Sequence, residues 1–344
     1  MVKACLDYTG PRSLFRRHRT GLPLRRHEIK RLRQVGHHDV GMAAAGNLDV
    51  GHIRVQLLQR GDRLDDLGVR GLDLRAFRRG HVRAAIERRL VAAADLLPDD
   101  EQLSDAERAR RERLREFGAG ITSFATDKLL AQVAFPLSGQ LWLADVATGA
   151  VNRVGEYNSV VDPRLNPRGD AIAFTDGADF VVYNLAAERE LFRLNAETET
   201  VSYGLADFIA AEELQRFRGH WWAPDVDRLL VERNEEAEVV ERWISDPTHP
   251  ESAPRAHRYP QAGTTNSAAS LWLVDLGDGS CQPIEWDSTE FEYLVEVNWN
   301  QTLPLITLAT RDQRLFKTYT VNGTELVEVD VQRDPDWVDA GTGL

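Results

Sequence analysis

The sequence is poor in cysteine and has no long hydrophobic run. Only Cys5 and Cys281 occur among its 344 residues, too few for a disulfide framework and without metal-ligand spacing, so we expect a reducing compartment. No apolar stretch reaches the roughly 18 residues that a membrane helix needs. The charged N-terminus is not followed by the apolar segment of a signal peptide. These absences predict a cytoplasmic protein with no membrane partner.

Aromatic residues are almost missing from the first part of the chain. Only three precede residue 96, whereas all eight tryptophans lie between Trp142 and Trp337. The same part is basic, with 20 Lys and Arg against 10 Asp and Glu in residues 1–95, although the whole chain has a formal charge of −12. Without large apolar side chains a segment cannot build a core. We therefore predict that residues 1–86 form a basic, Arg/Gly/His-rich segment that is irregular or poorly ordered.

The basic segment invites other interpretations. Lys and Arg neutralise phosphates, but binding of single-stranded nucleic acid also needs interleaved aromatic residues, so we expect no nucleic-acid partner. His27, His37 and His38 have no Cys or carboxylate partner at a recognisable spacing, so we expect no metal site. The Arg/Gly/Ala/His-rich composition is also what out-of-frame translation of GC-rich DNA produces. Reading the DNA in all frames tests that hypothesis.

Residues 87–344 contain a repeated strand pattern. LWLADVATG at Leu141 and LWLVDLGDG at Leu271 alternate apolar residues with period two and then turn on glycine, which is typical of a strand entering a hairpin. VVYNLAAE and TYTVNGTE are weaker copies. Taking Asp145, Asn184, Asp275 and Asn322 as equivalent gives steps of 39, 91 and 47 residues. A period of about 40 to 47 residues with several strands per repeat predicts an all-β fold made of β-propeller blades.

A second repeated element supports the blades and marks one of them as longer. RLNPRGDAIAF, WWAPDVDRLLV and NWNQTLPLITLA each predict a strand, a polar turn and another strand. The long step of 91 residues contains FIAAEELQRF, a stretch of good helix formers. We predict that this stretch is a helical insertion in one blade, leading back to a buried strand at Trp221 and Trp222.

The helical insertion places Glu212 and Glu213 next to each other. Adjacent residues on a helix point about 100° apart, so the two carboxylates cannot form one acid/base dyad. They can, however, flank a small cation, and a primary ammonium with its three N–H donors suits such a site. From the residues alone, a solvated acidic face is the simpler interpretation.

A second short helix is expected in SDAERARRERLREFGAGI. Ser104 is a candidate N-cap with Glu107 three residues later, and Gly118 and Gly120 would end the helix. Its arginines suggest a solvated basic face: Arg110, Arg111, Arg113 and Arg115.

Three of these segments resemble the dipeptidyl peptidase IV family of the prolyl oligopeptidase clan. They are AEELQRFRGHWWAPD, RYPQAGTTNSAASLWLVDL and RARRERLREFGAGI, and they are most similar to bacterial members and to the cytosolic dipeptidyl peptidases 8 and 9. The resemblance covers about Glu87 to Leu344. It implies an eight-bladed propeller that precedes an α/β-hydrolase domain in enzymes that remove dipeptides from peptide N-termini, favouring Pro or Ala in the penultimate position.

The resemblance also implies roles for individual residues. Glu212 and Glu213 match the pair that holds the α-ammonium group of the substrate. Arg115 is the best match to the arginine that contacts a substrate carbonyl, with Arg113 as the alternative. A further motif is expected to be structural, with Pro and Gly shaping a turn between strands: Tyr259, Pro260, Gly263 and Asn266.

The catalytic half of such an enzyme has no counterpart in this sequence. A serine hydrolase of this kind needs the nucleophile motif G-x-S-x-G, which occurs nowhere in the 344 residues, so we assign no catalytic residue, metal or cofactor. We expect a partial propeller of about four to five recognisable blades, truncated before the catalytic domain. It would serve as the substrate-recognition part of a serine dipeptidyl peptidase, with a separate α/β-hydrolase chain as partner.

A propeller that serves as a non-enzymatic protein-interaction module is the alternative, because fold alone does not determine function. An unclosed ring would also leave strand edges through which copies of the chain self-associate.

Overall fold

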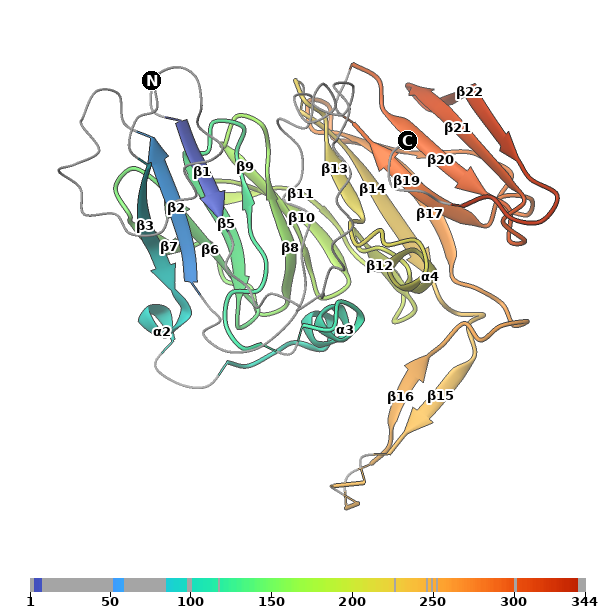
Figure 1. Ribbon diagram of the computed structural model, residues 1–344, viewed down its shortest axis with the longest axis horizontal. Helices are drawn as coiled ribbons and strands as arrows, with labels where there is room; N and C mark the ends of the chain where they lie inside the picture. Colours follow the sequence, from blue (N-terminus) through green and yellow to red (C-terminus); the bar gives the residue numbers. More distant parts are fainter. Residues whose placement is uncertain are drawn as a thin grey trace, which may run out of the picture.

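The computed structural model describes residues 101–339 except 117, 226, 246, 249, 252, 300 and 301, together with residues 85–97 and the strands at 3–7 and 52–58. The three histidines considered above as metal ligands lie outside these residues. In the described part, antiparallel strands form a series of sheets, and helices are few and short (Figure 1). None of these helices is long and apolar enough to cross a membrane.

Four of the sheets are propeller blades, each an antiparallel series of strands. The first blade contains β4 (Ala125–Thr126), β5 (Gln132–Leu137), β6 (Gln140–Asp145) and β7 (Val151–Arg153). The second contains β8 (Val160–Leu165), β9 (Ala171–Asp176), β10 (Asp179–Asn184) and β11 (Arg189–Leu194). The third contains β12 (Val201–Tyr203), β13 (His220–Trp222), β14 (Arg228–Glu235), β17 (Ala268–Asp275) and β18 (Ser280–Ile284). The fourth contains β19 (Tyr293–Asn298), β20 (Leu305–Ala309), β21 (Leu315–Asn322) and β22 (Glu325–Arg333).

The sequence repeats occupy equivalent places in these blades. The first repeat ends the last but one strand of every blade, where β6, β10, β17 and β21 run into a turn. In three of these turns the glycine has a positive φ, between 63° and 78°, which a glycine adopts without a Cβ clash. The second repeat forms two consecutive paired strands in each of three blades, β8–β9, β13–β14 and β19–β20. The predicted blade period and the all-β fold are therefore confirmed.

Apolar residues pack between successive blades. Phe174 and Val181 of the second blade pack with Leu141 of the first, and Phe180 and Val182 pack with residues of the third. A cluster that includes Trp221 of β13 joins the third blade to the fourth. Burying one such large side chain contributes roughly 1.5–3 kcal/mol. Each blade is therefore stabilised on both faces only where a neighbour covers it.

The spacing of 91 residues belongs to one blade with two insertions. The first insertion carries the helix α4 (Phe208–Glu212) between β12 and β13, as predicted, although the helix is shorter than the sequence stretch. Trp221 and Trp222 of β13 are buried, which confirms the predicted core strand. The second insertion, which the sequence did not indicate, is the hairpin of β15 (Glu241–Ile244) and β16 (Arg255–Arg258) between β14 and β17. It projects away from the blades in Figure 1.

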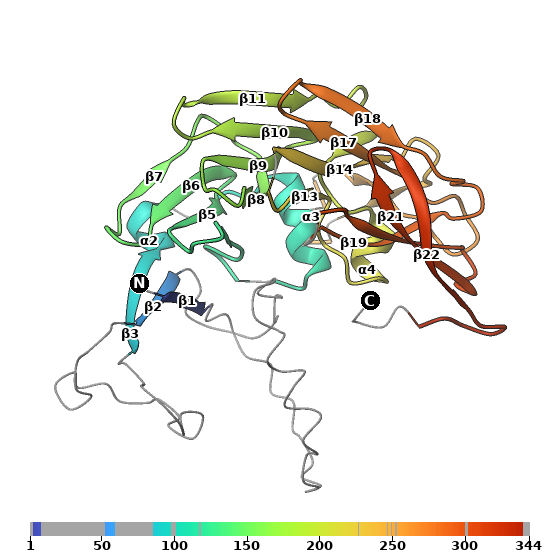
Figure 2. The same cartoon turned by 90° about the horizontal axis from the view of Figure 1, so that it is seen from above.

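A three-stranded sheet precedes the blades. β1 (Lys3–Asp7) pairs with β2 (His52–Leu58), which pairs with β3 (Ala85–Ala92), and the short helix α2 (Ala93–Leu96) follows. Two strands thus lie inside the segment expected to be irregular, whose remaining residues before β3 are outside the described part. Figure 2 shows this sheet and the four blades following one another around an arc, with β1–β3 and β22 at opposite ends.

Candidate functional site

The helix α4 presents the acidic pair at its C-terminal end. Asp207 caps the helix by accepting a hydrogen bond from the backbone N–H of Ala210 at 3.0 Å. Ala210 and Ala211 are buried, so this side of the helix faces the protein. Glu212 is the last helical residue and is half-buried, while Glu213 is exposed. Within the described residues neither carboxylate has an ion-pair partner.

The helix α3 (Asp105–Arg113) is capped by Ser104, whose side chain accepts from the backbone N–H of Glu107 at 3.2 Å, as the capping pattern predicts. The expectation that its arginines form a solvated basic face is wrong for two of them. Arg111 is buried and pairs with Glu101 and Glu107, each at 2.7 Å, and Arg110 pairs with Glu107 at 2.7 Å.

The physical reason is charge pairing inside the protein. Burial alone raises the pKa of Glu107, but Arg110 and Arg111 together hold it below its usual value. Arg110 also pairs with Glu116 at 3.0 Å. Alternating acidic and basic residues one helical turn apart neutralise one another, so the network can be buried although every member is charged.

The two helices lie side by side (Figures 1 and 2), and an arginine joins them. The guanidinium carbon of Arg113, the last residue of α3, lies 5.4 Å from the centre of the Phe208 ring, which is the first residue of α4. Phe208 also contacts Tyr259, with the two rings edge-on and their centres 5.1 Å apart. Phe208 therefore contacts both Arg113 and Tyr259 at the start of the helix whose end carries the acidic pair.

Arg115 lies differently. It is exposed and has a left-handed backbone conformation with φ of 54°. Its backbone N–H bonds to the carbonyl of Glu112, closing the turn after α3. The structure thus brings Arg113 to α4, while Arg115 makes no side-chain contact with α4 that we observe among the described residues.

The Tyr259 motif connects the hairpin to the next blade. The backbone N–H of Tyr259 donates to Val240 at 3.0 Å, and Asn266 donates to the carboxylate of Glu292 at 2.9 Å. Gly263 has a positive φ of 83° in the turn between them, which suits a glycine there. The turn geometry agrees with a structural role for this motif.

Sequence reasoning missed a buried charge cluster at the base of α4. Glu232 of β14 is fully buried (0% exposed), and Arg216 donates two hydrogen bonds to its carboxylate. Asp207 lies 3.6 Å from the same guanidinium, and its backbone N–H donates to Glu232 at 3.3 Å. The signal that could have revealed the cluster was Glu232, a charged residue that directly follows the apolar run Leu229–Val231 in β14. We call Asp207, Arg216 and Glu232 the hub.

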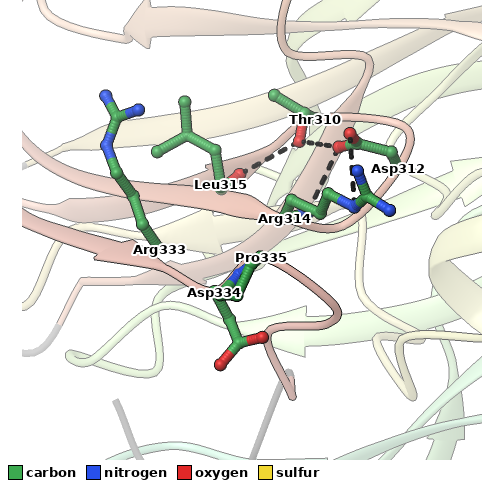
Figure 3. A pocket seen from close by; sticks show the side chains of 7 residues that line it. All are labelled: Thr310, Asp312, Arg314, Leu315, Arg333, Asp334 and Pro335. Atoms are coloured by element: carbon green, nitrogen blue, oxygen red, sulfur yellow. Dashed lines mark hydrogen bonds and ion pairs between the residues drawn. The ribbon is translucent and has the colours of Figure 1, made fainter.

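A cavity of about 410 Å³ lies elsewhere, at a turn of the fourth blade (Figure 3). In Figure 3 its two guanidinium groups, on Arg314 and Arg333, point away from one another. Asp312 accepts hydrogen bonds from Thr310 and from the backbone N–H of Arg314, so its carboxylate is occupied locally. The cavity therefore presents no converging set of polar groups. In the described part of the chain, no three His, Cys, Asp or Glu side chains are grouped to hold a metal ion.

The fold and the site define a class: an antiparallel β-propeller in which one blade carries a short helix ending in two carboxylates without an ion-pair partner in the described part of the chain. A model of the family "Dipeptidyl peptidase IV (DPP IV) N-terminal region" matches residues 124–342. The chain belongs to this family. The acidic pair lies within the matched region, whereas Arg113 and Arg115 precede it.

Individual relatives agree with this assignment. Dipeptidyl peptidase 8 of Mus musculus is 29% identical over 171 residues, 41% of this chain and 19% of that protein. The probable dipeptidyl-aminopeptidase B of Emericella nidulans is 25% identical over 206 residues, 53% of this chain and 22% of that protein. The crystal structure of Porphyromonas gingivalis dipeptidyl peptidase 4 matches with a TM-score of 0.57 and 19% identity, covering 75% of this chain and 38% of that one. The matched part thus spans about a fifth of the curated relatives.

Proposed function

We propose that the chain is the substrate-recognition propeller of a serine-type dipeptidyl peptidase, in which Glu212 and Glu213 bind the α-ammonium group of a peptide. The observation that carries the proposal is the pair of adjacent carboxylates at the end of α4, without a cation partner among the described residues. Two acceptors that point in different directions can share the three N–H donors of one ammonium group. Capture of the N-terminal amine in this way would restrict the site to chain ends.

Arg113 supports the proposal as a positive group that contacts the first residue of the helix whose last residue is Glu212. A guanidinium over the Phe208 ring interacts with the ring through its charge, so its N–H groups can still donate to a carbonyl oxygen of the bound peptide. The peptide would then be held at its amine by the carboxylates and along its backbone by the arginine. Penultimate Pro or Ala is the substrate preference that we propose, by likeness to the family.

Hydrolysis requires a nucleophile that these residues do not supply. With no G-x-S-x-G motif in the sequence, we propose that an α/β-hydrolase catalytic part outside these 344 residues completes the enzyme. We also propose a cytoplasmic location. Incubating the chain alone with an Ala-Pro chromogenic amide should give no turnover. Turnover that a serine-directed inhibitor abolishes would contradict this division of labour.

Binding of the ammonium group can be tested without catalysis. The tripeptide Ala-Pro-Ala should bind the chain in ligand-observed NMR, and its N-acetylated form should bind at least tenfold more weakly because it carries no positive amine. The double variant E212Q/E213Q should bind the two peptides with equal affinity. A matched variant, E325Q/D330N on β22, removes the same charge and should still bind the free peptide more tightly than the acetylated one. Equal binding of both peptides to the unmodified chain would instead favour a propeller that acts as a protein-interaction module.

A further inference from the structure

The insertion that carries the acidic pair leaves and rejoins the third blade at one point. Its two ends meet at the backbone bridge between Leu205 and Arg218. Both ends bond to the same residue of β14, because the N–H of Gly204 donates to the carbonyl of Glu232 and the N–H of Glu232 donates to the carbonyl of Gly219, each at 2.8 Å. A Cβ on Gly219 would overlap the backbone of Gly204 and Leu205, so the two segments are in close contact. The insertion is therefore a closed loop with Glu232 at its base.

The hub occupies the inside of this loop and reaches a second blade. Arg216, which lies just after α4, bonds to Glu232 of the third blade, to the carbonyl of Arg218 and, at 3.1 Å, to the carbonyl of Leu294 in β19 of the fourth blade. Asp207 joins the N-terminal end of α4 to the same guanidinium. One buried cation thus links both ends of α4 to two blades. A planar guanidinium with five donors can satisfy so many acceptors at once, whereas an ammonium group cannot.

We propose that Asp207, Arg216 and Glu232 are positioning residues, which hold the end of α4 so that Glu212 and Glu213 face the same bound amine beside Arg113. This inference rests on the proposed function. The helix has only five residues, too few to be stable by itself, so its orientation depends on these anchors. Removing one member of a buried, hydrogen-bonded charge cluster leaves the charges of the others uncompensated. We expect the local chain to rearrange in response, and α4 is the short element that these residues anchor.

Hydrogen exchange at pH 8 tests the positioning role independently of peptide binding. In E232Q, the backbone N–H groups of residues 211–214 should exchange about threefold to tenfold faster, while those of β9 remain unchanged. R216M should have a larger effect, and R216K should restore part of the protection because it keeps the charge. The matched control is D179N, which removes a carboxylate that likewise accepts from an arginine and a backbone N–H. D179N should leave hydrogen exchange in α4 unchanged.

Binding of Ala-Pro-Ala completes the test. E232Q should weaken it about threefold to tenfold, measured well below the melting temperature of the variant, which loss of the buried ion pair lowers. Unchanged exchange in α4, or faster exchange spread over all blades, would overturn the positioning role. If E212Q/E213Q leaves binding of Ala-Pro-Ala intact, the proposed function fails whatever the exchange shows. If E212Q/E213Q weakens binding of Ala-Pro-Ala but E232Q and R216M do not, the proposed function stands and the positioning role fails.

Discussion

At the scale of single residues, experiment can decide which of two arginines contacts a carbonyl of the bound peptide. The motif match favoured Arg115, whereas the structure brings Arg113 to the ring of Phe208 and leaves Arg115 exposed. We expect R113M, which keeps the alkyl stem against the ring but removes the charge, to weaken binding of Ala-Pro-Ala about fivefold to tenfold, or roughly 1 kcal/mol. R115M is the control and should bind nearly as the unmodified chain. The reverse order of effects would assign the role to Arg115.

The pH dependence of stability depends partly on His220. This residue is fully buried in β13, with its Nδ1 at 3.1 Å from the carbonyl oxygen of Gly204 and with no hydrogen-bond partner for Nε2 among the described residues. Burial lowers the pKa of His220 to about 4, although the nearby Asp162 opposes the shift and the guanidinium groups of Arg164 and Arg218 add to it.

The direction in which pH changes the free energy of unfolding follows from proton binding. Between pH 6.5 and 4 the unfolded chain binds a proton on His220 and the folded chain does not, so acidification over this range lowers the free energy of unfolding. Burial raises the pKa of Glu232 to about 7, against the attraction of Arg216, and this has the opposite effect between pH 7 and 4.5.

Comparison with H220Q separates the two groups, since Glu232 is present in both proteins. Urea denaturation at pH 7 and pH 4 should show that the unmodified chain loses stability relative to H220Q, by about 2 to 3 kcal/mol. A difference that does not change with pH would show that His220 is not the group that titrates.

At the scale of elements, α3 depends on its buried arginine. Arg111 bonds to two carboxylates and to the carbonyls of Gly118 and Gly120, each at 3.1 Å, which fixes the chain after the helix. R111M leaves Glu101 and Glu107 without this partner, and urea denaturation should show a loss of about 3 kcal/mol. R108M, on the same helix but in an exposed pair with Asp105, should cost no more than about 0.5 kcal/mol. Similar losses in the two variants would contradict a buried role for Arg111.

The elements also show which features the sequence could reveal. Period-two alternation recurs in every blade, and a turn glycine in three of them, because each blade packs its apolar side chains in the same way. These patterns located β6, β10, β17 and β21. The same local patterns located the cap of α3 and the helical insertion. The hairpin β15–β16 was missed because most of its residues are exposed, so no core-facing pattern marks it.

At the scale of the whole molecule, the strand edges predict self-association. β22 is the outer strand of the fourth blade, and its Val327 and Val329 are 50% and 53% exposed. An outer strand with apolar side chains invites pairing with another copy. We expect light scattering to show a mass that rises with concentration, and V327K/V329K to reduce it. L191K, on the outer strand β11 of the second blade, is the control and should have less effect. A monodisperse monomer at all concentrations would refute the prediction.

The sequence by itself determined the blade repeats, the core strand at Trp221 and Trp222, the helical insertion with its acidic pair, and the family. These depend on interactions between residues near in the chain, which leave periodic patterns and motifs. Only the tertiary structure decided that Arg111 is buried and Arg110 largely covered, that Arg113 contacts Phe208, and that Arg216 bonds to two blades. A charge looks the same in a sequence whether water or a carboxylate distant in the chain compensates it, and only the fold brings that partner close.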